Sequence, residues 1–163
     1  MKRRQTSVPR QWLVADDRLG KHVWRAVRTL PRGSGVLLIY RDLPKQERAR
    51  LKAKLRRIAG ARRLVIVDER AGQAGRVHSI RELGKAGLRR TPLLFLSPLF
   101  PTRSHPDWLP MPRMKAAALL RLSKAPVIAL GGMDSKRFSR IERLGFQGWA
   151  GIDAWLKVPK VTR

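Results

Sequence analysis

The sequence predicts an α/β fold with a central parallel sheet. Six short apolar runs are continuous rather than alternating, which is expected of parallel strands that are covered on both faces. They are residues 12–15, 36–40, 64–67, 93–96, 127–130 and 149–152. Stretches with helical spacing lie between most of these runs, and this alternation of strand and helix is typical of parallel α/β proteins.

Three of the intervening stretches have the period of a helix. The clearest has Leu51, Leu55 and Ile58 at positions i, i+4 and i+7, opposite a charged side. A second pattern covers residues 116–123, before a proline. A third covers 134–145, and it begins at an Asp-Ser pair that can cap a helix and ends at a glycine.

The number of strands limits the architecture. The six runs, with a seventh candidate near 76–78, fit either an open doubly wound sheet or an incomplete barrel. A full eight-stranded barrel usually takes at least ~200 residues, whereas this chain has 163. We expect a single domain over 11–156, between basic tails at 1–10 and 157–163.

The charge of the chain is strongly positive. Lysine and arginine number 37 against 11 acidic residues, which gives a net charge of +26. Such a surface attracts polyanions, so nucleic acid is one candidate partner. The basic residues are spread along the whole chain, however, and no helix-turn-helix, RNP-type motif or zinc ligand set accompanies them. A phosphorylated small molecule is the other interpretation, and nucleic acid is the weaker one.

The composition also limits the cellular compartments that the protein can occupy. Cysteine is absent, which excludes disulfides and thiolate metal sites. Every apolar run is far shorter than the ~20 residues of a membrane span, and nothing resembling a signal peptide follows the basic N-terminus. We expect a cytoplasmic protein with no membrane contact.

Polar side chains follow the predicted strands. The carboxyl ends of parallel strands meet at one edge of a sheet, where ligands bind. These positions are 16–18, 41–42, 68–70, 97–105, 131–132 and 153, and they hold arginines, carboxylates and a glycine pair. This set suits a phosphorylated ligand, with or without a divalent metal.

The glycine pair Gly131-Gly132 is the sharpest of these features. Glycines between a buried strand and a helix expose backbone N–H groups near a positive helix N-terminus, which suits a phosphate. The alternative is a tight turn that needs positive φ angles. Together with the polar loop at 97–105, the pair favours a phosphate site.

Three stretches resemble the thiamine phosphate synthase and thiazole tautomerase family. They read SPLFPTRSH, PVIALGGM and GFQGWAGIDAW, and the resemblance is good over 91–155 and weaker over 11–70. It implies a TIM-barrel-like fold, shortened here to about six or seven strands. It also implies a role in thiamine biosynthesis, either joining a pyrimidine diphosphate to a thiazole phosphate with release of pyrophosphate, or isomerising the thiazole ring.

The C-terminal motifs imply ligand-binding residues. By resemblance, Thr102, Ser104 and His105 grip the pyrophosphate side of the substrate. Gly131 and Gly132 match the seat of the thiazole phosphate.

The N-terminal half implies a second group of residues. Arg41 matches the arginine after the family's second strand. Asp68, Glu69 and Arg70 match an Asn-Asp-Arg stretch that holds pyrophosphate and magnesium. On this basis we expect Arg41 and Asp68 to be catalytic and Asp68 and Glu69 to be metal ligands, because Mg²⁺ prefers oxygen ligands.

Several positions depart from the family pattern. Ile39 and Leu43 replace a glutamine and a lysine, and the stretch after the third strand that carries a second metal-binding Asp in the family is largely deleted. Asp153 replaces a serine that helps hold phosphate, and a carboxylate there repels a phosphate dianion. The comparison therefore supports ligand binding better than full catalysis, and a non-catalytic binding protein is an alternative.

Two further residues allow more than one interpretation. His78 matches the histidine of the tautomerase branch, where it would shuttle a proton, but it is also a histidine at a predicted helix start. Trp108 either stacks on a substrate ring or packs its proline-rich loop. An interrupted barrel leaves strand edges open, and a homodimer is one way to cover them.

Overall fold

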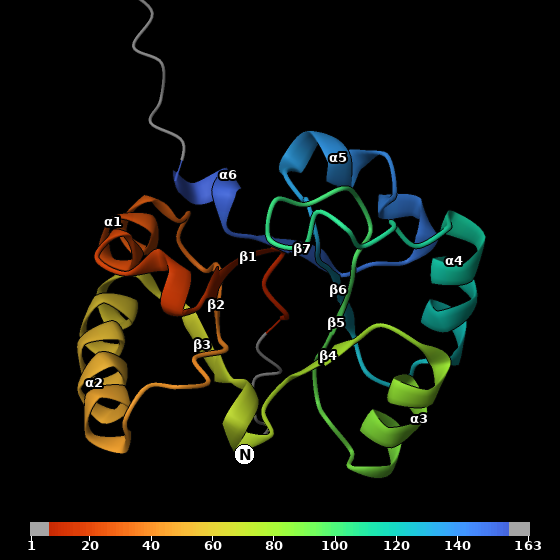
Figure 1. The fold of residues 1–163 in the computed structure, drawn as a ribbon. Helices are drawn as coiled ribbons and strands as arrows, with labels where there is room; N and C mark the ends of the chain where they lie inside the picture. The colour runs from red at the N-terminus through yellow and green to blue at the C-terminus, as the bar shows by residue number, and fades with distance from the viewer. Residues whose placement is uncertain (1–6, 157–163) are drawn as a thin grey trace, which may run out of the picture.

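Seven parallel strands form one curled sheet whose two edges are β3 and β4 (Figure 1). The structure is a computed structural model, and it describes residues 7–156. The strand order is β3-β2-β1-β7-β6-β5-β4. The strands are β1 (Gln11–Ala15), β2 (Gly35–Leu38), β3 (Val65–Asp68), β4 (Gly75–Val77), β5 (Leu94–Leu96), β6 (Val127–Ala129) and β7 (Gly148–Gly151).

The helices cover the outside of the sheet. They are α1 (His22–Thr29), α2 (Lys45–Arg62), α3 (Ile80–Leu88), α4 (Arg113–Leu122), α5 (Ser135–Ser139) and α6 (Asp153–Leu156), with 3₁₀ turns η1 (Asp17–Leu19), η2 (Glu69–Ala71) and η3 (Glu142–Leu144). Figure 1 shows α1 and α2 on one side of the molecule and α3 and α4 on the other. None of the helices within 7–156 is long and apolar enough to cross a membrane.

Alternate residues of each strand face two different layers, because successive side chains of a strand point to opposite faces. Trp12, Leu37, Phe95 and Ile128 come from four strands and meet in one buried interior cluster. The intervening side chains pack outward against the helices. An interior filled from strands far apart in the sheet is the arrangement of a barrel, so the incomplete barrel is the correct one of the two predicted architectures.

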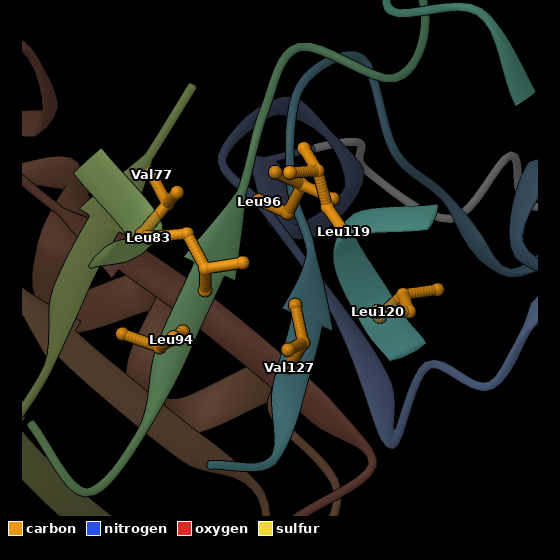
Figure 2. A pocket seen from close by; sticks show the side chains of 7 residues that line it. All are labelled: Val77, Leu83, Leu94, Leu96, Leu119, Leu120 and Val127. Atoms are coloured by element: carbon orange, nitrogen blue, oxygen red, sulfur yellow. The ribbon is translucent and has the colours of Figure 1, made fainter. Parts of the chain in front are cut away.

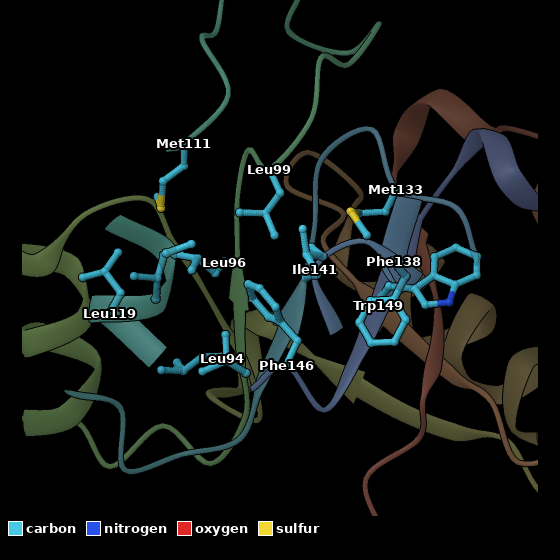
Figure 3. Packing of buried hydrophobic residues seen from close by; sticks show 14 residues of the cluster. Leu94, Leu96, Leu99, Met111, Leu119, Met133, Phe138, Ile141, Phe146 and Trp149 are labelled. Atoms are coloured by element: carbon cyan, nitrogen blue, oxygen red, sulfur yellow. The ribbon is translucent and has the colours of Figure 1, made fainter. Parts of the chain in front are cut away.

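The outer layer is well packed. Figure 3 shows Leu94 and Leu96 of β5 meeting Leu119 of α4, with Phe138 and Trp149 further along the same cluster. A gap between α3, α4 and the sheet, shown in Figure 2, is lined only by apolar side chains and has a volume of about 10 Å³. A space of this size is no larger than one water molecule needs, so it belongs to the core.

The barrel is open between β3 and β4. A crossover between neighbouring parallel strands takes about a dozen residues or more, and residues 69–74 are too few to provide one. Side chains of this short link cover the exposed edges instead. The Asp68 N–H donates to Gln73 Oε1 at 2.9 Å, and the Arg76 N–H donates to Glu69 Oε1 at 3.3 Å.

The predicted tails are only partly within the described residues. Pro9 is buried, and the Arg10 carbonyl accepts a hydrogen bond from the Trp149 N–H at 2.9 Å. The end of the predicted N-terminal tail therefore continues β1 alongside β7. The predicted C-terminal tail, 157–163, lies outside the described residues.

Candidate functional site

A cavity of about 1100 Å³ opens at the carboxyl ends of the strands. Protein sites for small molecules commonly enclose about 300–1,000 Å³, so the cavity has room for a ligand of substrate size. Seven of the predicted site residues line it: Arg41, His78, Thr102, Ser104, His105, Gly131 and Gly132. The structure thus brings together the rim loops that follow β2, β4, β5 and β6.

Asp68, Glu69 and Arg70 do not line this cavity. Val65 and Val67 of β3 pack in the barrel interior and Ile66 packs outward. Asp68 lies two residues after Ile66, and it consequently faces α2 on the outside of the sheet. The strand thus turns this carboxylate away from the site predicted for it.

Asp68 is held in a buried ion pair. It is 2% exposed, and it accepts hydrogen bonds from Arg48 and, at 2.9 Å, from Lys52 Nζ. It also accepts one from the Arg70 N–H at 3.0 Å, which caps η2. Burial by itself would raise the pKa of Asp68, but the hydrogen bonds and charges of Lys52 and Arg48 outweigh it and lower the pKa below its usual range.

Glu69 is bound to Arg76 of β4. Its Oε1 accepts from Arg76 Nε at 2.8 Å, and its Oε2 accepts from Arg76 Nη2 at 2.9 Å. Arg70 is exposed and its guanidinium donates to the Arg41 carbonyl at 3.4 Å, on the outside of the rim. These contacts give Glu69 and Arg70 a part in closing the open barrel.

The residues predicted for magnesium do not fit a metal ion. The carboxylate oxygens of Asp68 and Glu69 already accept hydrogen bonds from cations. Elsewhere in residues 7–156, no group of three or more His, Asp or Glu side chains is placed to hold a metal. On the rim itself, Asp16 is bound by the Arg18 guanidinium.

The glycine pair packs directly on the loop after β5. Gly131 has φ +95° and Gly132 has φ +60°, a region that other residues rarely adopt. A Cβ on Gly131 would lie 2.8 Å from Pro98 Cα, and one on Gly132 would overlap the Pro101 carbonyl oxygen. Both the positive φ angles and the close approach of the two loops require glycine here.

The same turn presents free hydrogen-bond donors. Within residues 7–156, the backbone N–H groups of Gly131, Gly132 and Met133 have no acceptor, while the Gly131 carbonyl accepts from the Phe100 N–H at 3.1 Å. All three residues line the cavity. Consecutive free N–H groups at a concave surface are suited to an anion.

An aromatic group lies on the β4–β5 side of the cavity. His78 Nδ1 is 3.1 Å from Ser97 Oγ and 3.0 Å from the Ser97 carbonyl oxygen. Trp108 meets the His78 ring edge-to-face at 5.2 Å and stacks on His105 at 4.3 Å. Since Trp108 is 44% exposed, its ring faces the solvent and the cavity rather than filling the core.

The charges of the cavity are unevenly distributed. Four aspartates, at 16, 17, 42 and 153, lie on the β1, β2 and β7 side. Arg18 and Arg41 offset two of these charges on that side. The β4–β6 side holds Arg76, Arg103 and Arg137 with the two histidines, against one carboxylate, Asp134. Burial and the negative charges of Asp16 and Asp17 together raise the pKa of Tyr40 to about 12. An anion is therefore favoured on the β4–β6 side.

Arg76 also lines the cavity, and the sequence analysis did not assign it to the site. The sequence does contain an indication of its position, because His78 is a predicted site residue and residues two apart in a strand share a face. Since 76–78 is only a candidate strand in the sequence, it does not assign Arg76 to a face.

The fold and the cavity together define a class of protein, TIM-barrel-like α/β proteins with a cavity at the strand carboxyl ends. A family model described as thiamine monophosphate synthase matches residues 74–155. Because it covers half of the chain, and because the fold agrees, the chain belongs to the thiamine phosphate synthase family.

Solved structures support the same fold. Thiamine phosphate pyrophosphorylase from Pyrococcus furiosus is similar with a TM-score of 0.77 and 18% identity, over 96% of this chain and 91% of that chain. The pyrophosphorylase from Bacteroides thetaiotaomicron is similar with a TM-score of 0.56 and 14% identity, over 96% of this chain and 89% of that chain. At these identities the likeness shows the fold alone. No curated protein matches the sequence significantly.

Proposed function

We propose that this chain is a thiamine phosphate synthase-like protein that binds phosphorylated pyrimidine or thiazole ligands in the cavity at the strand carboxyl ends. The observation that carries the proposal is the glycine turn, where residues 131–133 line the cavity and their three consecutive N–H groups have no acceptor in the described chain. A phosphate oxygen supplies the acceptor that such groups lack. We assign the thiazole phosphate to this turn.

The loop after β5 and Arg41 complete the proposed site. Thr102 and Ser104 carry hydroxyl groups at the rim, and the Thr102 hydroxyl accepts from the Ser104 N–H at 3.3 Å. This bond leaves the Thr102 proton available to a ligand. His105 and the exposed Arg41 extend the same rim. We assign these four side chains to the pyrophosphate side of the ligand.

Calorimetric titration with thiamine phosphate tests the proposal. We expect saturable one-site binding that thiamine, which lacks the phosphate, reproduces only at least about tenfold more weakly. Equal affinity for the two compounds would contradict a phosphate site.

We expect synthase turnover to be weak. Asp153 lines the same cavity as the proposed phosphate seat, and its charge disfavours the phosphate dianion. The pair Asp68 and Glu69 is committed to Arg48, Lys52 and Arg76 rather than to the departing pyrophosphate. A steady-state assay with the pyrimidine diphosphate, the thiazole phosphate and magnesium measures this. Turnover of about 1 per second or faster, an ordinary enzymatic rate, would contradict this expectation and make the chain a fully active synthase.

A tautomerase-like activity is the second candidate, and the position of His78 favours it. The ring lies in the cavity with Nδ1 on Ser97, so a tautomer with the proton on Nδ1 leaves Nε2 as a base. Replacing His78 with Gln should then abolish thiazole isomerisation, whereas replacing the exposed His22 should not. Isomerisation that survives His78→Gln would exclude this role.

The expected partners and location remain proposals. We propose a cytoplasmic homodimer, for which the exposed apolar side chains of Ile80, Leu88, Met114 and Leu122 on α3 and α4 provide a surface. Light scattering on the purified chain gives the mass directly, and a monomer would exclude the dimer. Nucleic-acid binding that weakens steeply with salt would instead favour the polyanion interpretation of the +26 charge.

A further inference from the structure

Arg76 is placed unusually for a charged residue of a barrel strand. Its neighbour Val77 packs in the outer layer with Leu94 and Leu96, so Arg76 faces the barrel interior. It pairs in register with Phe95, which belongs to the interior cluster. Only 19% of its side chain is exposed, yet it lines the cavity. Arg76 therefore forms part of the cavity floor, about 7 Å deeper along the strand than His78.

Glu69 fixes the orientation of this guanidinium. Two nitrogens, Nε and Nη2, donate to the two carboxylate oxygens in a bidentate pair. The remaining nitrogen, Nη1, has no acceptor within residues 7–156, and Glu69 itself does not line the cavity. The carboxylate thus holds one edge of the guanidinium and leaves Nη1, on the other edge, available to a ligand in the cavity that Arg76 lines.

Such an arrangement suits an anion. A phosphate oxygen on Nη1 lies nearer to the guanidinium than to the carboxylate on its opposite edge, so attraction outweighs repulsion. Arginine binds phosphate through a planar, directional donor set and keeps its charge at any ordinary pH. The cost of burying its charge in the barrel is already offset by Glu69.

We propose that Arg76 is an anion-binding residue at the cavity floor, and that its guanidinium, instead of a divalent cation, neutralises the phosphate charge of the ligand there. The inference rests on the proposed function, because it presumes a phosphorylated ligand in this cavity. It accounts for the disagreement between the family's magnesium and this chain, whose carboxylates at 68 and 69 are bound to cationic side chains. A ligand held at both Arg76 and the glycine turn carries phosphoryl groups at two positions, or one diphosphate between them.

Calorimetric titration of the full chain with inorganic pyrophosphate tests the proposal, in about 0.15 M salt to screen the general surface charge. We expect wild-type protein to bind pyrophosphate in EDTA at least as tightly as in magnesium. Arg76→Gln should weaken binding by about 10- to 100-fold, the loss expected for a charge-assisted hydrogen bond. The matched control is Arg121→Gln, which removes one charge from the exposed face of α4 and should leave the affinity unchanged.

A purely structural role for Arg76 predicts a different pattern. Arg76→Gln would then lower the unfolding temperature while the pyrophosphate affinity stays within about twofold of wild type, and that result would overturn the proposal. If Arg76→Gln does not unfold cooperatively, Arg76→Lys decides, because lysine keeps the charge but loses the planar donor set. A loss of about threefold or more in Arg76→Lys supports the proposal, and an unchanged affinity overturns it.

The controls separate this inference from the proposed function. Binding that appears only with magnesium would overturn the role of Arg76 and leave the phosphate site standing. Failure of both pyrophosphate and thiamine phosphate to bind, with or without magnesium, would overturn the proposed function and this inference with it.

Discussion

Asp68 ends β3 and Arg76 lies in β4, so the two charged residues of the described strands stand on opposite edges of one sheet. Asp68 faces outward and is closed in by Arg48 and Lys52 of α2. Arg76 faces inward and lines the cavity. The face of the strand on which a charged side chain lies, rather than its chemistry, thus decides whether it supports the fold or lines the cavity.

The largest expected effect is on stability, at Asp68. Asp68→Ala leaves two cationic side chains of α2 without their carboxylate, and breaking a buried pair in this way costs about 3 kcal/mol of unfolding free energy. Thiamine phosphate affinity should stay within about twofold of wild type. Denaturant unfolding and calorimetry measure the two quantities.

Glu47→Ala is the matched control for Asp68, because it removes an exposed carboxylate from α2, the helix that carries Arg48 and Lys52. It should leave both stability and affinity nearly unchanged. Loss of thiamine phosphate binding in Asp68→Ala at full stability would place Asp68 in the site and break the contrast.

The second effect is on binding, at the glycine turn. Gly132→Ala forces a Cβ against the Pro101 carbonyl and should reduce thiamine phosphate affinity by about tenfold or more. Gly72→Ala is the matched control, since Gly72 has φ +71° with nothing within 4 Å of an added Cβ. Each variant should lose about 1 kcal/mol of stability for its left-handed backbone, and Gly132→Ala should lose about 1–3 kcal/mol more for the overlap with Pro101; only Gly132→Ala should lose affinity. Equal affinities in the two variants would remove the phosphate from the turn.

The smallest effect is a change in the acid limb of stability. Since the folded pKa of Asp68 is lowered, the unfolded chain takes up a proton first, at about pH 4. The contribution of Asp68 is thus complete above that pH and is lost as pH falls through the lower folded pKa. Asp68→Asn should flatten this part of the curve of unfolding free energy against pH, and an unaltered slope would contradict the ion pair.

The fold could be predicted from the sequence because its strands are continuous apolar runs, and all six predicted runs overlap strands of the sheet. The loop at 97–105 and Gly131-Gly132 could be placed for the same reason, since they directly follow β5 and β6. The faces of β3 could not be predicted. Residues 64–67 are apolar on both faces, because the interior and the α2 side are both dry, so nothing marks where the next residue points.

The position of the open edge of the barrel could not be predicted for a related reason. The residue types of a short link do not indicate whether the two strands that it joins pair with each other. Only the length of residues 69–74, set against the length of a parallel crossover, indicates that β3 and β4 remain as edges. The role of Glu69 depends on this open edge. The Arg76 N–H has no partner strand on that side, and it donates to the Glu69 carboxylate instead.

A crystal structure of the chain with thiamine phosphate tests the central claim most directly. We expect the phosphate about 3 Å from the N–H groups of Gly131, Gly132 and Met133, with Asp68 still bound to Arg48 and Lys52. A phosphate held through a metal ion by Asp68 and Glu69 would contradict it.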